Sequence, residues 1–379
     1  MDVGLSGDGT VVNVMPGATE VPGAITGPWV DPDTVREHVG QHLAGFLEEQ
    51  HRIGTVGPAM AWAPLLLRDF LVGGKSLRPW LCALGWHAAG GQEATRQLVG
   101  LAAGLEMFHT FALIHDDVMD RSVSRRGRPT LHRLLADQLG GGRPRKADDR
   151  LGESAAILIG DLALSWSNTL IQQAGLTRAQ SARCLPLVER MHGEVVSGQF
   201  MDLASAGRPD ATMADALEIA RYKTAGYTFE RPLQLGAALA DGAPEVTEVL
   251  SAYAIPLGYA FQVRDDLLGV FGDPKRTGKS RLEDLRGGKC TVLLTTARER
   301  AGTVQRAVLD ELVGDPNLDE EGAARVRTVL DATGARQEAE AMIADWREQA
   351  RSAVLRAAFP APARAALLAL ADTATTRDS

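Results

Sequence analysis

The stretch TRQLVGLAAGLEMFHTFALIHDDVMD, from Thr95 to Asp120, decides the fold. Its apolar residues recur at three- and four-residue spacing over six turns, which is typical of a long helix in a protein core. Three more segments share its Ala- and Leu-rich composition and its helical spacing: 35–50, 152–175 and 246–269. Alternating β-branched runs joined by hairpin turns are nearly absent. The sequence therefore predicts an all-α fold.

The domain organisation follows from where this periodicity begins. Residues 1–30 are rich in Gly, Val and Pro and lack helical spacing, so we predict a flexible N-terminal arm. Residues 31–379 should form one large helical bundle around a central cavity, although 379 residues would also allow two or three domains. The polar, glycine-rich stretch 137–149 is predicted to be a mobile surface loop.

Composition excludes several classes of protein. The three cysteines, Cys82, Cys184 and Cys290, are scattered and form no CxxC pair, which argues against a disulfide scaffold or a zinc site. No secretory signal is recognisable at the N-terminus and no run reaches about 18 uninterrupted apolar residues, so we expect a cytoplasmic protein without an integral membrane segment. A net charge of −8 argues against nucleic acid as a partner.

The first chemical signal is the acidic run that ends the opening stretch. Asp116 and Asp120 are four residues apart, so on a helix their carboxylates share one face about 5.4 Å apart. With Asp117 between them, the run has no basic partner inside the motif, and its charges would repel one another. Oxygen ligands of this kind favour Mg²⁺ shared with substrate phosphates. Taken alone, the run could equally be a solvated helix end.

A second acidic pair makes that alternative weaker. Asp265 and Asp266 also end an apolar helical segment, and Asp273 follows eight residues after Asp265. Two acidic clusters on separate core helices are most simply explained if they face each other across one cavity with metal ions between them.

Basic residues stand in the connecting segments. Lys75 and Arg78 follow the glycine pair Gly73-Gly74, a pattern suited to gripping phosphate, because Arg forks onto phosphate oxygens and Lys supplies a point charge. Arg125 and Arg126 come soon after Asp120 in a segment that could fold back over the same cavity. Further donors stand at Lys223, Thr224 and Lys279. Any one of them could be a plain surface charge, but all together are poorly explained that way.

With these motifs in place, the sequence resembles the trans-isoprenyl diphosphate synthases, the polyprenyl synthetase family. The resemblance runs from about Gly73 to Thr291, through GGKSLRP, HTFALIHDDVMDRSVSRRGRPT, GEVVSGQFMDL, YKTAG and FQVRDDLLGVFGDPKRTGKS. It implies a homodimeric, all-helical enzyme. The implied reaction is head-to-tail condensation of isopentenyl diphosphate with an allylic diphosphate (dimethylallyl, geranyl or farnesyl), using about three Mg²⁺ ions per site.

The resemblance also assigns roles to individual residues. It implies that Asp116, Asp120 and Asp265 bind the metal and that Asp117 and Asp266 support them. It implies that the allylic diphosphate is held by Arg125, Lys223, Thr224, Gln262 and Lys279. It implies that isopentenyl diphosphate is held by Lys75, Arg78, His109 and Arg126. Without the motif around it, His109 would be taken for a core histidine. Gln199 and Asp202 match a family element near the second acidic wall and are expected to act from behind the ligands.

One position departs from the family pattern. Many relatives carry a third aspartate in the second motif, where this chain has Gly269. The orientation of the metal there should be weaker or should be supplied by Asp273. Because Asp265 is intact, activity is still expected.

Product length should be set by bulky residues below the first acidic motif. Phe111 and Phe108, five and eight residues before Asp116, are the candidates for the floor of the cavity, although either could be a plain core residue. Ala112, four residues before Asp116, is small and leaves that level of the cavity open. In the family, a chain with an aromatic residue only at the fifth position before this motif, and not at the fourth, resembles the geranylgeranyl producers. The resemblance therefore implies a C20 product, with C15 farnesyl diphosphate as the alternative.

Two other functions remain to be weighed. A class I terpene cyclase also ionises an allylic diphosphate with DDxxD and Mg²⁺, but it needs no isopentenyl diphosphate site such as Lys75 and Arg78. A non-catalytic regulatory subunit should have lost metal ligands, whereas this chain keeps both acidic pairs. Both are less favoured than the synthase.

Overall fold

The computed structural model describes residues 29–140, 145–277 and 280–376, which are almost entirely helical, and this confirms the all-α prediction. The first helices are α1 (Pro32–Ile53), η1 (Pro58–Met60), α2 (Ala63–Leu71), α3 (Leu77–Ala88), α4 (Arg96–Met119), α5 (Leu131–Leu139), α6 (Arg145–Gln173) and α7 (Arg178–Ser205). The later ones are α8 (Met213–Ala220), the π-helix η2 (Arg221–Glu230), α9 (Arg231–Leu239), α10 (Pro244–Phe271), α11 (Pro274–Thr277), α12 (Glu283–Arg286), α13 (Val292–Arg300), α14 (Thr303–Leu312), α15 (Glu320–Ala332), α16 (Ala335–Leu355) and α17 (Ala361–Thr376).

Helix ends follow the local sequence. At α1 the Asp31 carboxylate accepts a hydrogen bond from the Thr34 amide at 2.8 Å, with Pro32 at the first helical position, and the helix stops at Gly54 with φ of 65°. Thr95 caps α4 through the Leu98 amide. These caps satisfy amide groups that the first turn leaves without a partner. The long core helix predicted from the opening stretch therefore begins and ends within a residue of its sequence signals.

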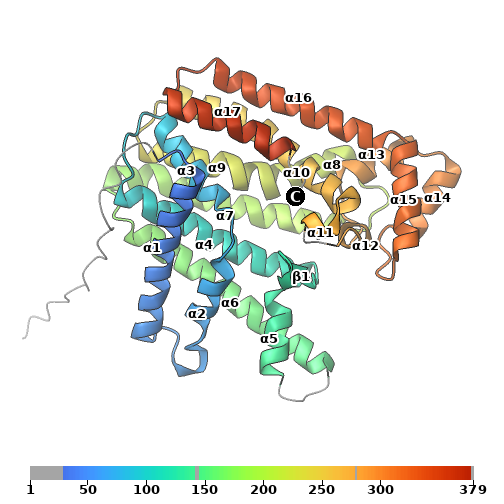
Figure 1. Ribbon diagram of the computed structural model, residues 1–379, viewed down its shortest axis with the longest axis horizontal. Coiled ribbons are helices and arrows are strands. Elements are labelled where there is room, and N and C mark those ends of the chain that lie inside the picture. The colour runs from blue at the N-terminus through green and yellow to red at the C-terminus, as the bar shows by residue number, and fades with distance from the viewer. Residues whose placement is uncertain (1–28, 141–144, 278–279, 377–379) are drawn as a thin grey trace, which may run out of the picture.

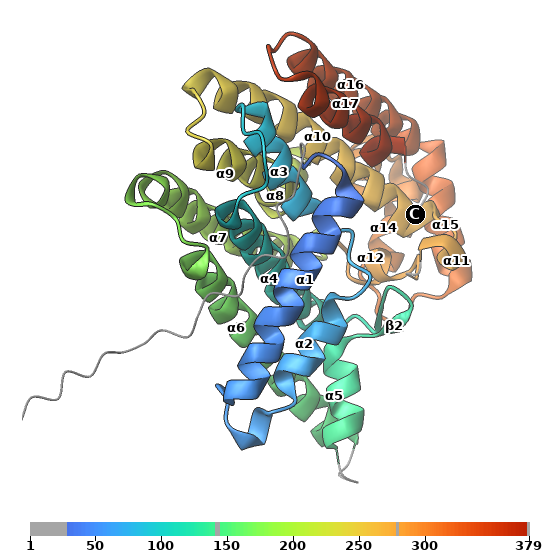
Figure 2. The ribbon, with the colours of Figure 1, turned by 60° about the vertical axis from the view of Figure 1, so that its left-hand side comes forward.

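The helix α4 occupies the centre of the bundle (Figures 1 and 2). It packs on α6, α3 and α1 and contributes a run of fully buried residues to the largest apolar core. A second core joins α10 to α13, α15 and α16, and a third joins α3 and α9 to α10, α16 and α17. In Figure 1 α16 and α17 lie along α10 on the side away from α1 and α2. This arrangement holds α4 and α10, the carriers of the acidic pairs, in one rigid body.

A hairpin with two residues in each strand is the one antiparallel strand pair among the described residues. β1 (Ser124–Arg125) pairs with β2 (Arg128–Pro129). The turn residues Arg126 and Gly127 have positive φ values of 52° and 72°, which is the conformation that two-residue hairpin turns require. The hairpin brings Arg125 back towards the end of α4.

Two boundaries differ from the sequence predictions. Residues 1–28 of the predicted arm lie outside the described residues, but Trp29 is buried and its amide donates to His87 Nε2 at 2.7 Å. The predicted mobile loop 137–149 is wrong over most of its length, because residues 137–139 end α5 and residues 145–149 begin α6. Arg145 of α6 pairs with Asp137 of α5, and Arg133 of α5 pairs with Asp149 of α6, so charges that suggested a loop join the two helices.

By length and composition, two described helices, α4 and α6, are apolar enough to cross a membrane. Of the most apolar window of α4, 72% is buried inside the protein, compared with 44% for α6. Core helices of folded proteins have the same composition, and α4 has that position here. The apolar character of α6 is shared between the core and an outer face.

Candidate active site

The first acidic motif lies on the last turn of α4. Asp116 and Asp117 are helical, and Asp120 is the residue that caps the helix. The Arg125 guanidinium from the hairpin donates to both oxygens of Asp117, at 2.9 and 2.8 Å, and to Asp116 at 3.3 Å. Asp117 is fully buried by this contact. The repulsion expected within the motif is therefore offset by a cation from the next loop.

Lys223 provides a second cation, from the π-helix η2. Its ammonium donates to Asp116 at 3.0 Å and to Asp202 of α7 at 2.6 Å. Two glycines allow η2 to approach its neighbours. A Cβ at Gly198 of α7 would lie 2.5 Å from the Lys223 amide nitrogen, and one at Gly258 of α10 would lie 2.3 Å from an η2 backbone atom. Because α7 and α10 each have a glycine where they meet η2, η2 lies close enough for Lys223 to reach both carboxylates.

The second acidic motif lies on α10 and is joined to the first through η2. Thr224, the neighbour of Lys223, hydrogen-bonds to the Gln262 side chain, which donates to Asp266 at 2.8 Å. Asp265 is half-buried beside it. The two acidic helix ends are thus connected by consecutive residues of one segment. The cavity and the metal ions predicted between the two motifs stay predictions.

Lys289 was not among the residues predicted from sequence. Its ammonium donates to Asp120 at 2.8 Å and lies 3.5 Å from Asp284, so it bridges the first motif to the segment after α10. A signal for it exists in the chain: Gly287-Gly288-Lys289 repeats the string Gly73-Gly74-Lys75.

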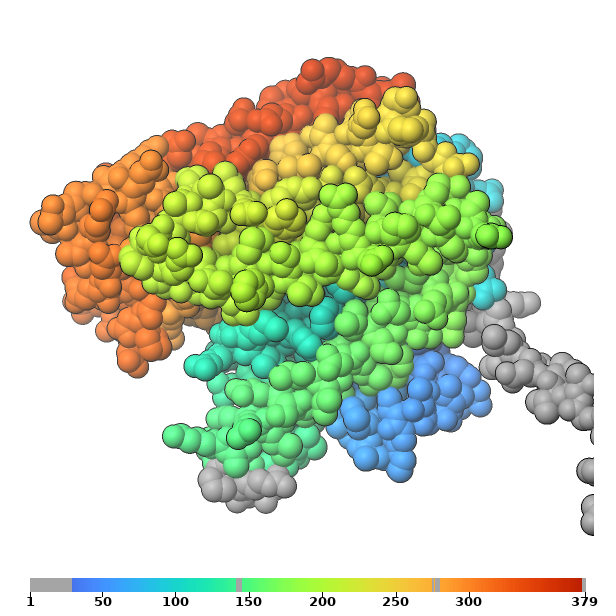
Figure 3. All heavy atoms as spheres, turned by 180° about the vertical axis from the view of Figure 1, so that it is seen from behind, coloured from blue at the N-terminus to red at the C-terminus, as the bar shows by residue number. Residues whose placement is uncertain are grey.

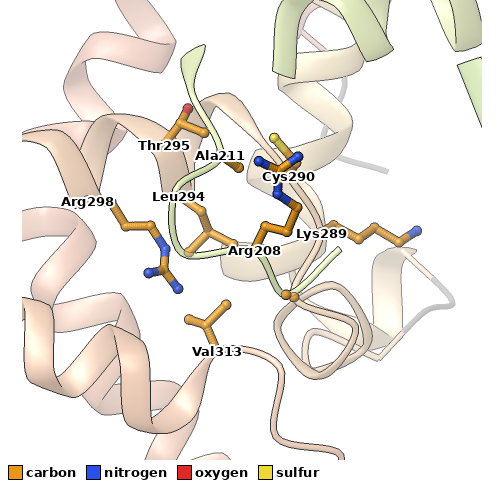
Figure 4. Close-up of a pocket in the computed structure, with 10 residues that line it drawn as sticks. Arg208, Ala211, Lys289, Cys290, Leu294, Thr295, Arg298 and Val313 are labelled. Carbon is orange, nitrogen blue, oxygen red and sulfur yellow. The ribbon is translucent and has the colours of Figure 1, made fainter. Parts of the chain in front are cut away.

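The backbone around Lys289 is tied to the end of α7. The Gly207 amide donates to the Gly288 carbonyl at 2.8 Å, and the two segments enclose a hollow of about 10 Å³, room for about one water. Figure 4 shows this hollow with Lys289 extending away from Val313 and Arg298. The hollow is too small for a substrate, and the contact instead fixes the loop that presents Lys289.

The missing third aspartate of the second motif has a structural counterpart. A Cβ at Gly269 would lie 2.0 Å from an oxygen of Asp284, so the Asp284 carboxylate fills the space in front of that glycine. The two sequence-based alternatives, a weaker orientation of the metal or a carboxylate from Asp273, stay predictions. The carboxylate that lies next to Gly269 is that of Asp284, fifteen residues along the chain.

Electrostatics differ sharply among the carboxylates. Burial raises the pKa of Asp116, but Lys223, Lys289 and Arg125 outweigh that effect and leave it well below its ordinary value. Burial dominates at Asp120, whose pKa is raised although Lys289 opposes the shift. Burial raises the pKa of Asp266 to about 8 against the hydrogen bond from Gln262. Asp266 therefore holds a proton at neutral pH that a nearby cation would displace.

The predicted isopentenyl diphosphate residues gather beside the hairpin. Arg78 donates to Thr228 at 2.6 Å and lies over the Tyr227 ring, 4.3 Å from its centroid. His109 Nδ1 is 2.8 Å from the Tyr227 hydroxyl oxygen. Burial, reinforced by the neighbouring arginines, holds the pKa of His109 well below its usual range, so the ring is neutral.

A buried carboxylate organises the remaining cations there. Glu106 lies one turn before His109 on α4, and burial raises its pKa although Arg78 and Arg126 oppose the shift. A Cβ on Gly74 would lie 3.1 Å from Glu106 and 3.7 Å from Arg126, so the hairpin and the glycine pair meet at this point. Lys75 is exposed next to them. Glu106 and Tyr227 were missed because a single acidic or aromatic residue in a helix carries no spacing signal.

The remaining predicted residues have varied positions. Gln199 is half-buried, with its amide 3.6 Å from the Met119 sulfur. Lys279 lies outside the described residues. Phe108 is 1% exposed, and Phe111 is half-buried one turn nearer the acidic motif. The metal and diphosphate assignments to individual residues stay predictions, but their side chains do converge on one region.

The donor set fits magnesium. No three His, Cys, Asp or Glu side chains within the described ranges converge into a metal cage formed by protein alone. Mg²⁺ is usually bound by one or two carboxylates together with waters and substrate phosphates, and all the candidate ligands here are carboxylate oxygens. Burial raises the pKa of Asp266, so a nearby cation would stabilise the charged form of this carboxylate. These residues could hold Mg²⁺ shared with a diphosphate.

Comparison with known proteins decides the family. The model of the polyprenyl synthetases matches residues 62–332. The chain belongs to the polyprenyl synthetase family. It is a prenyltransferase, an isoprenyl diphosphate synthase that condenses isoprenoid diphosphates.

Individual relatives of this synthase carry different product names. It is 35% identical to the geranylfarnesyl diphosphate synthase of Aeropyrum pernix over 75% of its own length and 84% of the relative's. It is 32% identical to the (2E,6E)-farnesyl diphosphate synthase of Mycobacterium tuberculosis over 71% and 70%.

A solved structure is similar over almost the whole chain. The geranylgeranyl pyrophosphate synthase of Corynebacterium glutamicum, complexed with isoprenyl diphosphate and magnesium, superposes with a TM-score of 0.86 at 36% identity, covering 92% of this chain and 99% of that one. The reaction class is common to these relatives, whereas their product lengths differ.

Proposed function

We propose that this isoprenyl diphosphate synthase makes a C20 product, geranylgeranyl diphosphate, by adding isopentenyl diphosphate to dimethylallyl, geranyl and farnesyl diphosphates. The observation that carries the proposal is the half-buried Phe111 on α4, one turn below the first acidic motif, with the small Ala112 leaving the level above it open. A C15 product is the alternative, since a floor closer to Asp116 would stop the tail sooner.

The cations and carboxylates would divide the chemistry between two diphosphates. When bound, about three Mg²⁺ ions would neutralise the allylic diphosphate, which makes it a better leaving group. Lys223 already reaches the first acidic motif, so its ammonium is placed to share the charge of that leaving group. Arg78 and Arg126 would fix isopentenyl diphosphate so that its double bond faces the allylic carbon.

The presence of both cationic groups also bears on the cyclase alternative. A cyclase uses one diphosphate, yet this chain carries Arg78 on α3 and Arg126 in the hairpin turn in addition to Lys223 on η2. A second set of diphosphate ligands has a use only when two substrates bind.

The floor of the cavity can be tested by opening it. Phe111→Ala removes the aromatic ring one turn below Asp116, so we expect products longer than C20, with further lengthening when Phe108 is also reduced. Chromatography of the dephosphorylated alcohols measures this. Leu113→Ala, two residues further along α4, is a control for loss of apolar volume. An unchanged distribution in the double variant would show that length is set elsewhere.

The two diphosphate groups predict separate kinetic effects. Arg78→Ala removes a charged hydrogen-bond donor worth about 1.5–3 kcal/mol, and it should raise KM mainly for isopentenyl diphosphate. Lys223→Ala should act mainly on the allylic substrate. Initial rates with each substrate varied in turn give both KM values. Equal changes in both KM values in every variant would contradict the division of roles.

We further propose that the synthase is a homodimer through the outer face of α6 and α7. Figure 3 shows these helices side by side on one face of the molecule. Six of their large apolar side chains are exposed: Ile157, Leu158, Leu185, Val196, Phe200 and Leu203. Exposed apolar side chains gathered on one face of a protein mark association sites. A monomer mass by sedimentation at micromolar concentration would contradict this proposal.

A further inference from the structure

The rings of His192 and Phe108 stack between α7 and α4. Their centroids are 4.1 Å apart and their planes differ by 13°. Phe108 also contacts Phe111, with ring centroids 5.3 Å apart, and Tyr227 edge-on at 5.7 Å. Phe108 is thus held from three sides, and His192 is the one of its aromatic neighbours that comes from α7.

The stack lies between the two helices that lead to the acidic motif. Lys223 bonds both Asp116 of α4 and Asp202 of α7, which places these two carboxylates at the same level. Phe108 stands eight residues before Asp116, and His192 ten residues before Asp202. At ~1.5 Å per residue these separations are about 12 and 15 Å. The helices therefore run in the same direction, and the stack closes the space between them two to three turns below the carboxylates.

The imidazole is suited to an apolar boundary. His192 Nε2 is buried and lacks a hydrogen-bond partner among the described residues. Burial lowers the pKa of His192 to about 4, so the ring is uncharged at neutral pH. A buried ring nitrogen without a partner is an energetic cost that packing has to offset. The stacking on Phe108 provides such packing.

We propose that His192 is a specificity-determining residue, which forms with Phe108 the second layer that stops the growing apolar tail below Phe111. Phe111 alone presents one ring from one helix, and a tail that displaced it would next meet the stack. The stack cannot retreat easily, because the far side of Phe108 is backed by Tyr227, whose hydroxyl is fixed by His109. The inference rests on the proposed chain-elongation function and adds a residue from α7 to its floor.

The experiment compares four proteins with the same substrates, isopentenyl and farnesyl diphosphates: the unaltered chain, His192→Ala, His192→Phe and Gly193→Ala. His192→Ala should shift the main product by at least one C5 unit and should lengthen it further when combined with Phe111→Ala. His192→Phe restores a flat ring and should keep the original length. Gly193 is exposed with open space around it, so Gly193→Ala is the matched control and should keep the original product.

The outcomes separate this inference from the proposed function. If the unaltered chain makes no elongated diphosphate, the proposed function fails. If it elongates and His192→Ala gives the same product distribution, alone and with Phe111→Ala, the role of His192 is overturned. Should His192→Ala not fold, as judged by its thermal melt, His192→Leu fills most of the volume without the flat ring and carries the same test. Shorter products from either variant would also overturn the proposal.

Discussion

Asp116→Asn and Asp265→Asn are each expected to lower kcat by about a thousandfold or more, with little change in fold. Each substitution keeps the shape of the side chain but removes one anionic oxygen ligand from a wall of the site. The loss is on the scale of removing a main electrostatic contribution to a transition state. The loss of kcat should be larger for Asp116, because its carboxylate also positions Lys223 and contacts Arg125. Single-turnover pyrophosphate release measures the effect.

Asp210→Asn is the matched control for these substitutions. Asp210 is exposed and pairs with the nearby Arg208, so its loss should leave kcat unchanged. Circular dichroism should give the same helical content for all three variants. A loss below tenfold at both Asp116 and Asp265 would be incompatible with a role for the two motifs in binding the metal.

The second large effect is expected from metal removal. Excess EDTA should abolish turnover, and added Mg²⁺ should restore it, because the described carboxylates form no protein-only cage and need a cation to receive a diphosphate. The raised pKa of Asp266 also predicts how the Mg²⁺ requirement changes with pH. Protons compete with the cation for this carboxylate, so the Mg²⁺ concentration for half-maximal activity should fall as the pH rises towards 8.

A chelator control keeps the test specific. The thermal melt recorded with and without EDTA distinguishes loss of the catalytic cation from loss of the fold. Asp266→Asn should flatten the pH dependence of the Mg²⁺ requirement, since the titrating carboxyl is gone. Full turnover in excess EDTA would contradict the magnesium site, and an unchanged pH dependence in Asp266→Asn would assign the effect to another group.

The sequence by itself determined the helices and the pair of acidic walls. Apolar spacing over Thr95–Asp120 and over 246–269 reports burial of one helix face, which is a local property of the chain. The position of Asp116 four residues before Asp120 then places both on one face without any tertiary information.

Charge composition was a weaker guide. The stretch 137–149 reads as a loop because it is polar and rich in glycine, but most of it is helical, and the Arg145–Asp137 ion pair joins α6 to α5 there. Sequence spacing cannot show that Arg145 and Asp137 will meet, because the pairing depends on the angle between two helices.

Only the tertiary structure decided which distant groups meet. Lys289 reaches the site from a loop fixed by a backbone contact with the end of α7, and Asp284 of α12 takes the place in front of Gly269. Lys223 joins Asp116 to Asp202 because two flanking glycines let a π-helix approach. His192 becomes part of the candidate floor because α7 runs beside α4. Each of these contacts depends on how helices pack at long sequence separation, which local periodicity does not encode.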